Sequence, residues 1–339
     1  MRVEKIISVA ADGYNYTCGY HTSNKWIDND RIVLARSITA EISSNSELVV
    51  YTISTDSFSV ISNKLNSWLD YVVLKSSIYY LAENKIRRFD IDSGCDTELA
   101  SFGDLRVGSP HLTHDGRYMS LFSYSATDGM IAYRFDTESK NLERVFSKQF
   151  EMPLPIANHL MISPTEPSNF FFAHEGDTRQ INDRLWIYNE QTGMRNIAMQ
   201  SVIDGGVPED CFGHEAWAPD GRGIYFVKYP LSLSVPYGIA YADISGCEYK
   251  ILYSAYDYWH VSVSQCGKYL AADTIYPGKS QIVFIDVENN TEELIEITES
   301  RKKHPNHPHP TISPAGNKVA YNSIDSRGFD CVRIAFIEK

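Results

Sequence analysis

The chain has 339 residues, of which 43% are apolar and 22% charged, as is typical of a water-soluble globular protein. Its 31 basic and 43 acidic residues give a net charge of −12, which argues against a nucleic-acid or anionic-membrane binder, because such binding depends on clustered Lys and Arg. The start, MRVEKIISVAADGYNYT, does not resemble a signal peptide, and no window approaches the ~18 apolar residues of a membrane span, so we expect a cytoplasmic protein.

Before residue 105, the sequence predicts two strand-rich units. The first runs through NKWIDNDRIVLARS and ELVVYTISTDSFSVI, and the second through DYVVLKSSIYYLAENKIRRFDIDSGCDTELA. Both contain short runs of β-branched and aromatic residues that are separated by polar turn residues, the pattern of short strands joined by turns.

After these units, a turn of the type Ser-Pro-Asp-Gly recurs, each time followed by an alternating apolar run. The five copies start at residues 113, 163, 218, 264 and 313, which lie 50, 55, 46 and 49 residues apart, and the copy at 163 is degenerate. Each turn predicts a hairpin of two short strands. A second strand pair follows in most copies, for example in IAYRFDTESKNLERVF.

Each unit therefore holds about four short strands in roughly 45–55 residues, the signature of a β-propeller blade. The two units before residue 105 and the five turn-containing units after it make seven. The sequence therefore predicts an all-β fold, a seven-bladed β-propeller of four-stranded blades. We expect the N-terminal residues to complete the last blade, which would remove the free edges. Two stacked β-sandwiches would not give so regular a repeat. Because no linker rich in Pro, Gly or Ser interrupts the chain, residues 1–339 are predicted to form a single domain.

Several other kinds of chemistry lack their sequence signature. The chain has no GxSxG nucleophile elbow and no Walker or Rossmann glycine pattern. Its six cysteines are scattered without a CxxC pair, so we interpret them as reduced thiols, most of them buried.

Histidines recur at one position of the repeat, four residues before the turn begins. This position holds His159, His214, His260 and His309 in the fourth to seventh blades, and Ser109 in the third. The position lies on the innermost strand, which lines the central channel of a propeller. We therefore expect four consecutive blades to direct an imidazole towards one place.

The segment HPNHPHP, which proline excludes from a helix, adds two more histidines to this set. His307 shares strand parity with His309, and His304 lies three residues upstream. Imidazoles that converge without carboxylate partners are natural ligands of Zn, Ni, Fe or Mn, and all-imidazole sites favour Zn or Ni. His260, His307 and His309 are the best ligand set, with His304 as a candidate fourth ligand. The alternative is that these are ordinary polar residues of a channel.

Further candidates follow in FFAHEGDTRQINDRLWIY of the fourth blade. Arg184 is either a clamp for a substrate carboxylate, which suits its planar guanidinium, or a surface cation at a strand end. Residues assigned to substrate contacts are His159, His174, Arg179 and Tyr258. Glu215, opposite His214 on its strand, is assigned to a structural role. Trp217 and Trp259 are assigned to the blade cores, with a substrate platform as the alternative, and Tyr258 fits either role.

The strings GHEAWAPDG, HEGDTRQINDRLW, YWHVSVSQCGKYLAADT and above all HPHPTISPAGNKVAYNS resemble oligogalacturonate lyases. The start of the first blade, GYHTSNKWIDNDRIVLARS, resembles that family too. The resemblance covers most of the chain and is strongest in the fourth to seventh blades. The turn motif alone is shared with TolB-like propellers.

This resemblance implies a cytoplasmic seven-bladed propeller that cleaves short pectin fragments by β-elimination with a divalent metal, typically manganese. It places metal ligands at His260, His307 and His309, and a fourth at His304, where the family has Gln. It places the catalytic base at His214 and the catalytic arginine at Arg184. The expected partner is a small anionic oligosaccharide, with no nucleic acid and no membrane.

Two alternatives to this function remain open from the sequence. One is a related metal-dependent enzyme acting on another sugar acid, a reading favoured by the shorter stretch between His260 and His307 than is usual in the family. The other is a non-enzymatic TolB-like propeller that binds a metal or a partner protein. The metal itself is expected to be Mn²⁺, with Zn²⁺ and Ni²⁺ as alternatives.

Overall fold

The computed structural model describes residues 2–11, 13–39, 46–203, 205–274, 278–301 and 304–338. Within these ranges the chain forms β-strands and turns and no helix, so the all-β prediction is confirmed. The strands form the seven four-stranded blades of a β-propeller, and the single pair Leu65–Ala82 joins the first two blades into one eight-stranded sheet. The chain divides into two compact units, which are Met1–Asp104 with His260–Lys339 (unit 1) and Leu105–Trp259 (unit 2). That residues 1–339 form a single domain stays a prediction.

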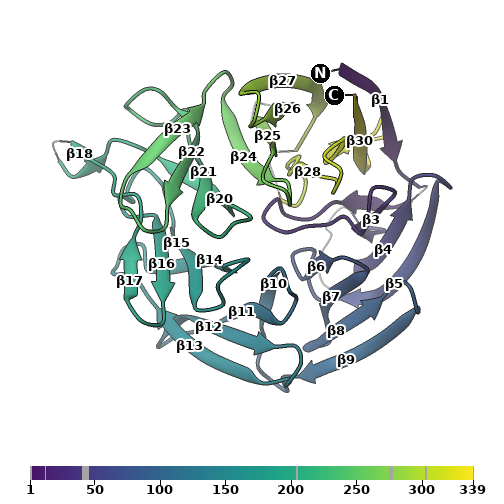
Figure 1. Ribbon diagram of the computed structural model, residues 1–339, viewed down its shortest axis with the longest axis horizontal. Helices are drawn as coiled ribbons and strands as arrows, with labels where there is room; N and C mark the ends of the chain where they lie inside the picture. The colour runs from purple at the N-terminus through teal and green to yellow at the C-terminus, as the bar shows by residue number, and fades with distance from the viewer. Residues whose placement is uncertain are drawn as a thin grey trace. The chain divides into compact units, whose positions relative to one another are not determined.

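Unit 1 contains four blades of antiparallel strands (Figure 1). The first consists of β2 (Asn15–Thr17), β3 (Arg31–Ser37), β4 (Ser46–Thr52) and β5 (Ser57–Leu65). The second consists of β6 (Tyr71–Leu74), β7 (Ser77–Ala82), β8 (Lys85–Asp90) and β9 (Cys95–Ser101). The sixth, of which only the first two residues belong to unit 2, consists of β24 (Tyr258–Val263), β25 (Tyr269–Thr274), β26 (Lys279–Asp286) and β27 (Thr291–Glu299). The seventh consists of β28 (Thr311–Ile312), β29 (Lys318–Ile324), β30 (Asp330–Glu338) and β1 (Arg2–Val9).

Unit 2 contains three blades and one small hairpin that the sequence did not indicate. The third blade consists of β10 (Gly108–Leu112), β11 (Tyr118–Ser125), β12 (Gly129–Asp136) and β13 (Leu142–Lys148). The fourth consists of β14 (Ile156–Ile162), β15 (Asn169–Glu175), β16 (Leu185–Asn189) and β17 (Gly193–Asn196). The fifth consists of β20 (Phe212–Trp217), β21 (Gly223–Lys228), β22 (Gly238–Asp243) and β23 (Tyr249–Tyr253). The hairpin pairs β18 (Val202–Ile203) with β19 (Val207–Pro208).

The N-terminal strand completes the C-terminal blade, as predicted. β1 runs antiparallel to β30, with paired residues from Arg2–Glu338 to Val9–Val332. The two chain ends therefore lie side by side, as Figure 1 shows. Both edges of β30 are hydrogen-bonded as a result, because its other neighbour is β29.

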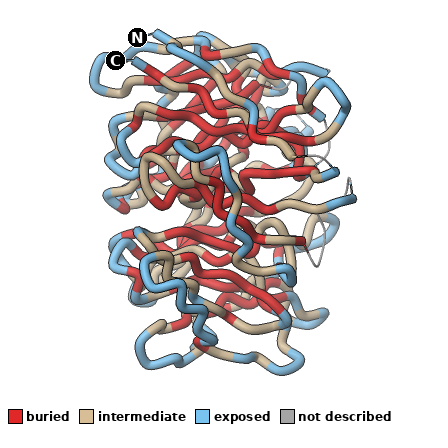
Figure 2. The backbone as a smooth tube through the Cα atoms, turned by 90° about the vertical axis from the view of Figure 1, so that its right-hand side faces the viewer, coloured by how far each residue is buried: buried red, intermediate tan, exposed pale blue. Residues whose placement is uncertain are grey.

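Within each unit, the hydrophobic core lies between neighbouring blades, and sheets that lie between two blades of their unit are buried on both faces. Strand β15 illustrates this with three consecutive buried phenylalanines. Phe171 packs into the cluster shared with the fifth blade, whereas Phe170 and Phe172 pack into the cluster shared with the third. Alternate residues of a strand point to opposite faces, so a strand covered on both sides reads as a continuous apolar run. Figure 2 shows buried residues along the strands and exposed residues in the turns.

The recurrent turn has the same geometry in four blades, which confirms the repeat. In each turn the glycine N–H donates to the carbonyl three residues earlier, at 2.8–2.9 Å. Each glycine has a left-handed φ of 66–78°, a conformation that side chains disfavour. These glycines are Gly116, Gly221, Gly267 and Gly316.

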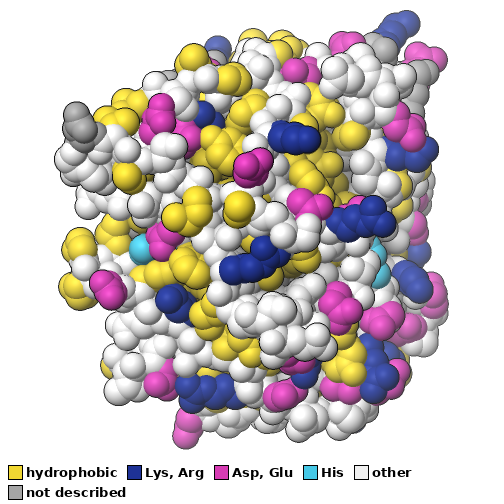
Figure 3. Space-filling view, turned by 60° about the vertical axis from the view of Figure 1, so that its left-hand side comes forward, with side chains coloured by type: hydrophobic (Ala, Val, Ile, Leu, Met, Phe, Trp, Pro, Cys, Tyr) yellow, Lys and Arg dark blue, Asp and Glu magenta, His cyan; other side chains and the backbone are white. Residues whose placement is uncertain are grey.

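Three further findings concern the surface and the thiols. Acidic and basic side chains are interspersed on the face shown in Figure 3. Over the described ranges, no helix is long and apolar enough to cross a membrane. All six cysteines are free, and because Cys95, Cys247 and Cys266 are exposed, the prediction that most are buried is wrong.

Candidate functional site

The position four residues before the turn has an unusual backbone in four blades. Ser109, His159, His214 and His309 have left-handed φ angles of 52°, 55°, 55° and 43°. His260 is not among the described non-glycine residues with positive φ. A shared and rarely populated conformation confirms that these four positions are structurally equivalent.

In unit 2 each of these residues coincides with a break in strand pairing. A β-bulge bends the strand and redirects a side chain, and bulges are common beside functional sites. The register shifts lie between Gly108 and His111, between Asn158 and Met161, and between Gly213 and Ala216.

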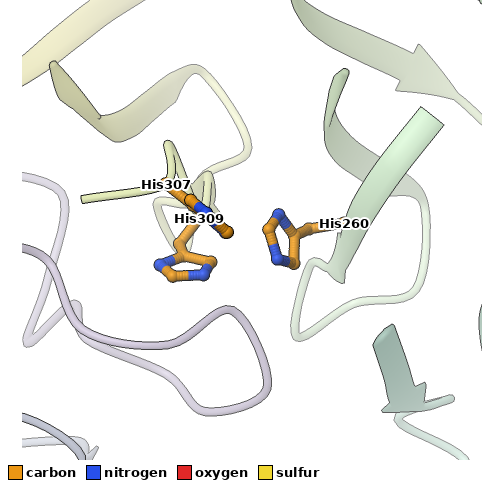
Figure 4. Close-up of side chains that lie close together, drawn as sticks. All are labelled: His260, His307 and His309. Carbon is orange, nitrogen blue, oxygen red and sulfur yellow. The ribbon is translucent and has the colours of Figure 1, made fainter. Parts of the chain in front are cut away.

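Within unit 1, three of the predicted ligands come together. His260 is part of β24, and His307 and His309 lie in the segment that precedes β28. One ring nitrogen from each lies within 4.8 Å of the others, and all three residues are buried (Figure 4). Imidazole nitrogens at such separations can share one divalent cation after a small adjustment, because ligand–metal distances are about 2.0–2.1 Å.

A carboxylate behind His260 orients its ring. The Nδ1 atom lies 2.9 Å from both Oδ1 and Oδ2 of Asp273, a fully buried residue of β25. The expectation of imidazoles without carboxylate partners is therefore wrong for His260. With Nδ1–H donated to the carboxylate, the ligand lone pair is on Nε2, which is the usual arrangement of a metal-binding histidine.

Asp273 also links the two ligand-bearing blades of unit 1. It accepts the backbone N–H of His260 at 2.8 Å and that of His309 at 3.1 Å. Burial raises the pKa of Asp273 to about 8, although these N–H donors favour the charged form. A cation bound to His260 would favour the carboxylate further.

The candidate fourth ligand, His304, lies at the exposed side of this cluster. Its ring centre is 4.5 Å from that of His307 and 5.3 Å from that of His309. It is exposed, whereas the other three are buried, and it is not part of the group whose nitrogens lie within 4.8 Å. The ring also stacks near Trp68, at 5.8 Å.

Asn322 of β29 holds the histidine-bearing segment in place. Its Nδ2 donates to the carbonyls of Pro305 (3.1 Å) and His307 (2.9 Å), and its backbone N–H donates to that of Pro308 (2.7 Å). Its Oδ1 accepts the N–H of Cys18 at 2.8 Å. Because proline has no N–H, side-chain contacts of this kind replace the missing strand pairing.

An N-terminal segment that carried no predicted site residue packs against the same cluster. The ring centre of Tyr20 lies 4.9 Å from that of His309, and the ring centre of His21 lies 5.1 Å from that of His260. Neither residue occupies the repeat position used in the sequence analysis. The string GYHTSNKW resembles the lyase family, but the spacing of its residues does not match the repeat that identified His260 and His309.

In unit 2, Arg184 is buried, so its alternative assignment as a surface cation is wrong. Its Nε donates to Glu215 Oε1 at 2.7 Å, and its Nη2 donates to Glu175 Oε2 at 3.2 Å. Burial alone would raise the pKa of Glu215, but the charge of Arg184 holds it well below its ordinary value. The carboxylate therefore stays ionised beside the guanidinium.

His159 belongs to the same network. Its Nδ1 lies 3.0 Å from Glu215 Oε2, and its Nε2 lies 3.6 Å from Glu175 Oε2. Glu215 thus connects His159 and Arg184 of the fourth blade to the fifth, a role that agrees with its structural assignment. The network joins two strand ends through charged hydrogen bonds rather than apolar packing.

His214 has the hydrogen bonds of a base with a defined tautomer. Its Nδ1–H donates to the carbonyl of Trp259, and the same nitrogen lies 2.8 Å from Tyr229 Oη. The lone pair of the neutral ring is then on Nε2. Trp259 is half-buried and its ring stacks on that of Tyr229 at 4.6 Å, and its assignment to a blade core stays a prediction. Trp217, by contrast, packs against a core cluster as expected.

The remaining predicted substrate contacts are differently placed. His174 has hydrogen bonds at both nitrogens, to Asp183 Oδ1 (2.6 Å) and the carbonyl of Leu154 (2.7 Å), which fits a structural role. Arg179 is exposed and bonded to Asp177. Tyr258 is fully buried and offers a substrate no surface, so its assignment to a substrate contact is corrected to the blade interior.

Comparison with known proteins shows similarity in structure only. No protein-family model and no curated protein sequence matches the chain. An oligogalacturonate lyase solved in complex with manganese has a TM-score of 0.80 at 15% identity, over 98% of this chain and 93% of that one. An oligogalacturonate lyase from Vibrio parahaemolyticus has a TM-score of 0.79 at 14% identity, over 98% and 94%.

TolB-type propellers are more distant in structure at similar identity. TolB from Acinetobacter baumannii has a TM-score of 0.51 at 15% identity, over 88% of this chain and 78% of that one. The fold is therefore that of the oligogalacturonate lyase propellers, and it extends over nearly the whole chain.

Proposed function

We propose that this chain is a metal-dependent lyase that cleaves short oligogalacturonides by β-elimination. The observation that carries the proposal is the buried cluster of His260, His307 and His309, backed by Asp273. It occurs in a fold that is similar to oligogalacturonate lyases, one of which is a manganese complex.

The donor set fits a divalent cation, which His260, His307 and His309 would hold, with His304 beside them. A cation there would neutralise the uronate carboxylate and stabilise the charge that develops on it during proton removal. Manganese is the ion of the lyase complex, and Zn²⁺ and Ni²⁺ are the alternatives that imidazole ligands favour.

His214 is the proposed base. The carbonyl of Trp259 fixes the tautomer in which Nε2 can accept the proton next to the uronate carboxylate. Loss of this proton forms the carbon–carbon double bond, breaks the bond to the glycosidic oxygen, and leaves that oxygen to take up a proton. The reaction requires the base and the cation to act on the same uronate.

Arg184 is the proposed catalytic arginine. Its guanidinium is held at Nε by the short bond to Glu215 and more loosely by Glu175, at 3.2–3.4 Å. Glu215 and Glu175 already balance the charge of Arg184. A substrate carboxylate can therefore bind Arg184 only if it displaces Glu175 from the Nη atoms, whose hydrogen bonds are the longer ones. Arg184→Lys should therefore reduce turnover, because Lys lacks the planar fork.

Absorbance of the unsaturated uronate, with short oligogalacturonides and added Mn²⁺, tests the proposal. His214→Ala should abolish turnover and leave the metal content unchanged, whereas His260→Ala should lower both. The control is His114→Ala, at an exposed histidine in the turn between β10 and β11. Loss of metal from His214→Ala would mean that a ligand had been mistaken for the base. Absence of turnover in the wild-type chain with every metal and oligomer length would favour the non-enzymatic alternative.

A further inference from the structure

His21 lies against the candidate metal centre although it is remote from the other ligands in sequence. It is buried in the segment between β2 and β3. Its ring centre is 5.1 Å from that of His260 and 6.1 Å from that of His309. In Figure 4 the loop of the N-terminal segment runs beside the three ligand side chains, in agreement with these separations.

The separations between these rings are those of imidazoles that share one ion. With a metal–nitrogen distance of about 2.0–2.1 Å, each ring centre lies about 3.2 Å from the ion, so two such centres lie about 4.5–6.4 Å apart. The ring centres of His260 and His307, 5.4 Å apart, lie within this range, and those of His260 and His309, 4.4 Å apart, lie just below it. Both separations from His21 fall within the expected range.

The hydrogen bond of His21 also has the form that a metal ligand needs. Its Nδ1 lies 2.8 Å from the carbonyl oxygen of Val261, the residue after His260. A carbonyl accepts only from N–H, so Nδ1 carries the proton and the lone pair is on Nε2. His260 is oriented in the same way, with its Nδ1 directed to Asp273. Carbonyl and carboxylate acceptors are the usual partners of metal-binding histidines.

The backbone around His21 is tightly held. Gly19 has a φ of 77°, and a side chain there would approach Lys25 Cε to 2.8 Å. The N–H of Gly19 donates to Thr17 Oγ1 at 3.1 Å, and the N–H of Cys18 donates to Asn322, which also holds His307. One hydrogen-bonded network therefore positions the His21 segment and the ligand segment together, as a preorganised site requires.

We propose that His21 is a ligand of the metal centre, its Nε2 joining the cation that His260, His307 and His309 would hold. Because His21, like His304, is not part of the group whose ring nitrogens lie within 4.8 Å of one another, its ring would move towards the cation when the metal binds. The proposal rests on the proposed metal centre and adds to it a donor from the first blade. Nitrogen donors in this number favour a borderline ion such as Zn²⁺ or Ni²⁺ over Mn²⁺.

The test is titration calorimetry with Zn²⁺ and Mn²⁺ on the full chain, together with electron paramagnetic resonance after loading with Cu²⁺, whose spectrum reports the coordinated nitrogens. His21→Gln keeps a donor for the Val261 carbonyl but removes the imidazole, and His21→Phe keeps the ring alone. Both should weaken Zn²⁺ binding at least about tenfold and change the Cu²⁺ spectrum. The control His114→Gln should leave both measurements unchanged.

An unchanged Cu²⁺ spectrum in His21→Gln, whether or not the affinity falls, would overturn the proposal, because it would place His21 outside the coordination sphere. In that case His260→Gln would still lose the metal, and the proposed function would stand. If the wild-type chain binds none of the three ions, the metal centre and His21 as its ligand both fail.

Discussion

At the scale of single residues, the site depends on side chains that bind no substrate themselves. Asn322 is the clearest example, because it bonds to the carbonyls of Pro305 and His307 and to the N–H of Cys18. The two carbonyls belong to the segment that precedes β28, whereas the N–H belongs to the segment that follows β2. The side chain of Asn322 thus links the two segments. Asn322 therefore positions the segment that carries His307 and His309.

Asn322→Ala should lower the affinity for Zn²⁺ about 10–100-fold, because loss of its amide removes two of the hydrogen bonds that position the histidine-bearing segment. Titration calorimetry measures the change. The control is Ser323→Ala, which removes a neighbouring buried hydroxyl bonded to Thr298 Oγ1 at 2.6 Å, away from the ligands. Equal affinities in the two variants would contradict the assigned role.

Lys25 is a buried cation close to the same segment, and it links stability to pH. Burial lowers its pKa to about 7 from 10.5. Between these values the unfolded chain binds a proton that the folded chain does not, so stability rises with pH. Burial of the charged Lys25 amine lowers the free energy of unfolding. This destabilisation is fully present below about pH 7 and disappears as the pH approaches 10.5.

Lys25→Met should therefore flatten the dependence of the unfolding free energy on pH between about 7 and 10, and should stabilise the protein by about 1–2 kcal/mol at pH 6. Urea denaturation at a series of pH values provides the measurement. Lys268→Met, at an exposed ion pair with Glu288, is the control and should leave the slope unchanged. A slope equal to that of the wild type in Lys25→Met would show that the buried amine does not titrate in this range.

Sequence reasoning identified the histidines that the structure brings together, because they follow the repeat, and missed the polar residues that hold them. His260 and His309 share one offset from the turn, and His307 follows by strand parity. Asp273 and Asn322 lie on second strands of their blades, where polar residues carry no periodic signal, and their partners come from other strands. Tyr258 was misassigned because alternation predicts which face a side chain lies on but not how deeply it is buried.

At the scale of elements, the seventh blade depends on a strand from the other end of the chain. β1 pairs with β30 over most of its length and buries Val9 in the cluster shared with the first blade. This closure was predictable, because the final blade lacked a fourth strand in the sequence. The hairpin β18–β19 was not, because its strands have only two residues each.

Deletion of residues 1–9 should destabilise the protein by about 3 kcal/mol or more and promote aggregation, since β30 would present an unpaired edge. Thermal unfolding and light scattering measure the two effects. A synthetic peptide with the sequence RVEKIISV should restore stability, and a scrambled peptide of the same composition should not. Full stability of the deleted chain would show that β1 is dispensable.

At the scale of the whole molecule, the repeat predicts one cooperative structure, because similar blades follow one another without a linker. We expect a single calorimetric transition in which the calorimetric and van't Hoff enthalpies agree. Saturating Zn²⁺ should shift that transition upward as a whole. Two transitions, of which only one responds to Zn²⁺, would contradict the single-domain prediction and would match the division between unit 1, which contains His260, and unit 2.

The left-handed backbone at the inner-strand position has a consequence for redesign. Ser109 shares this conformation with His159, His214 and His309, and none of them is glycine. The blade determines the backbone conformation at this position, and that conformation accepts both serine and histidine. The side chain can therefore be exchanged without a change in the backbone. Grafting a histidine onto the third blade at Ser109 would extend the series of imidazoles without rebuilding any loop.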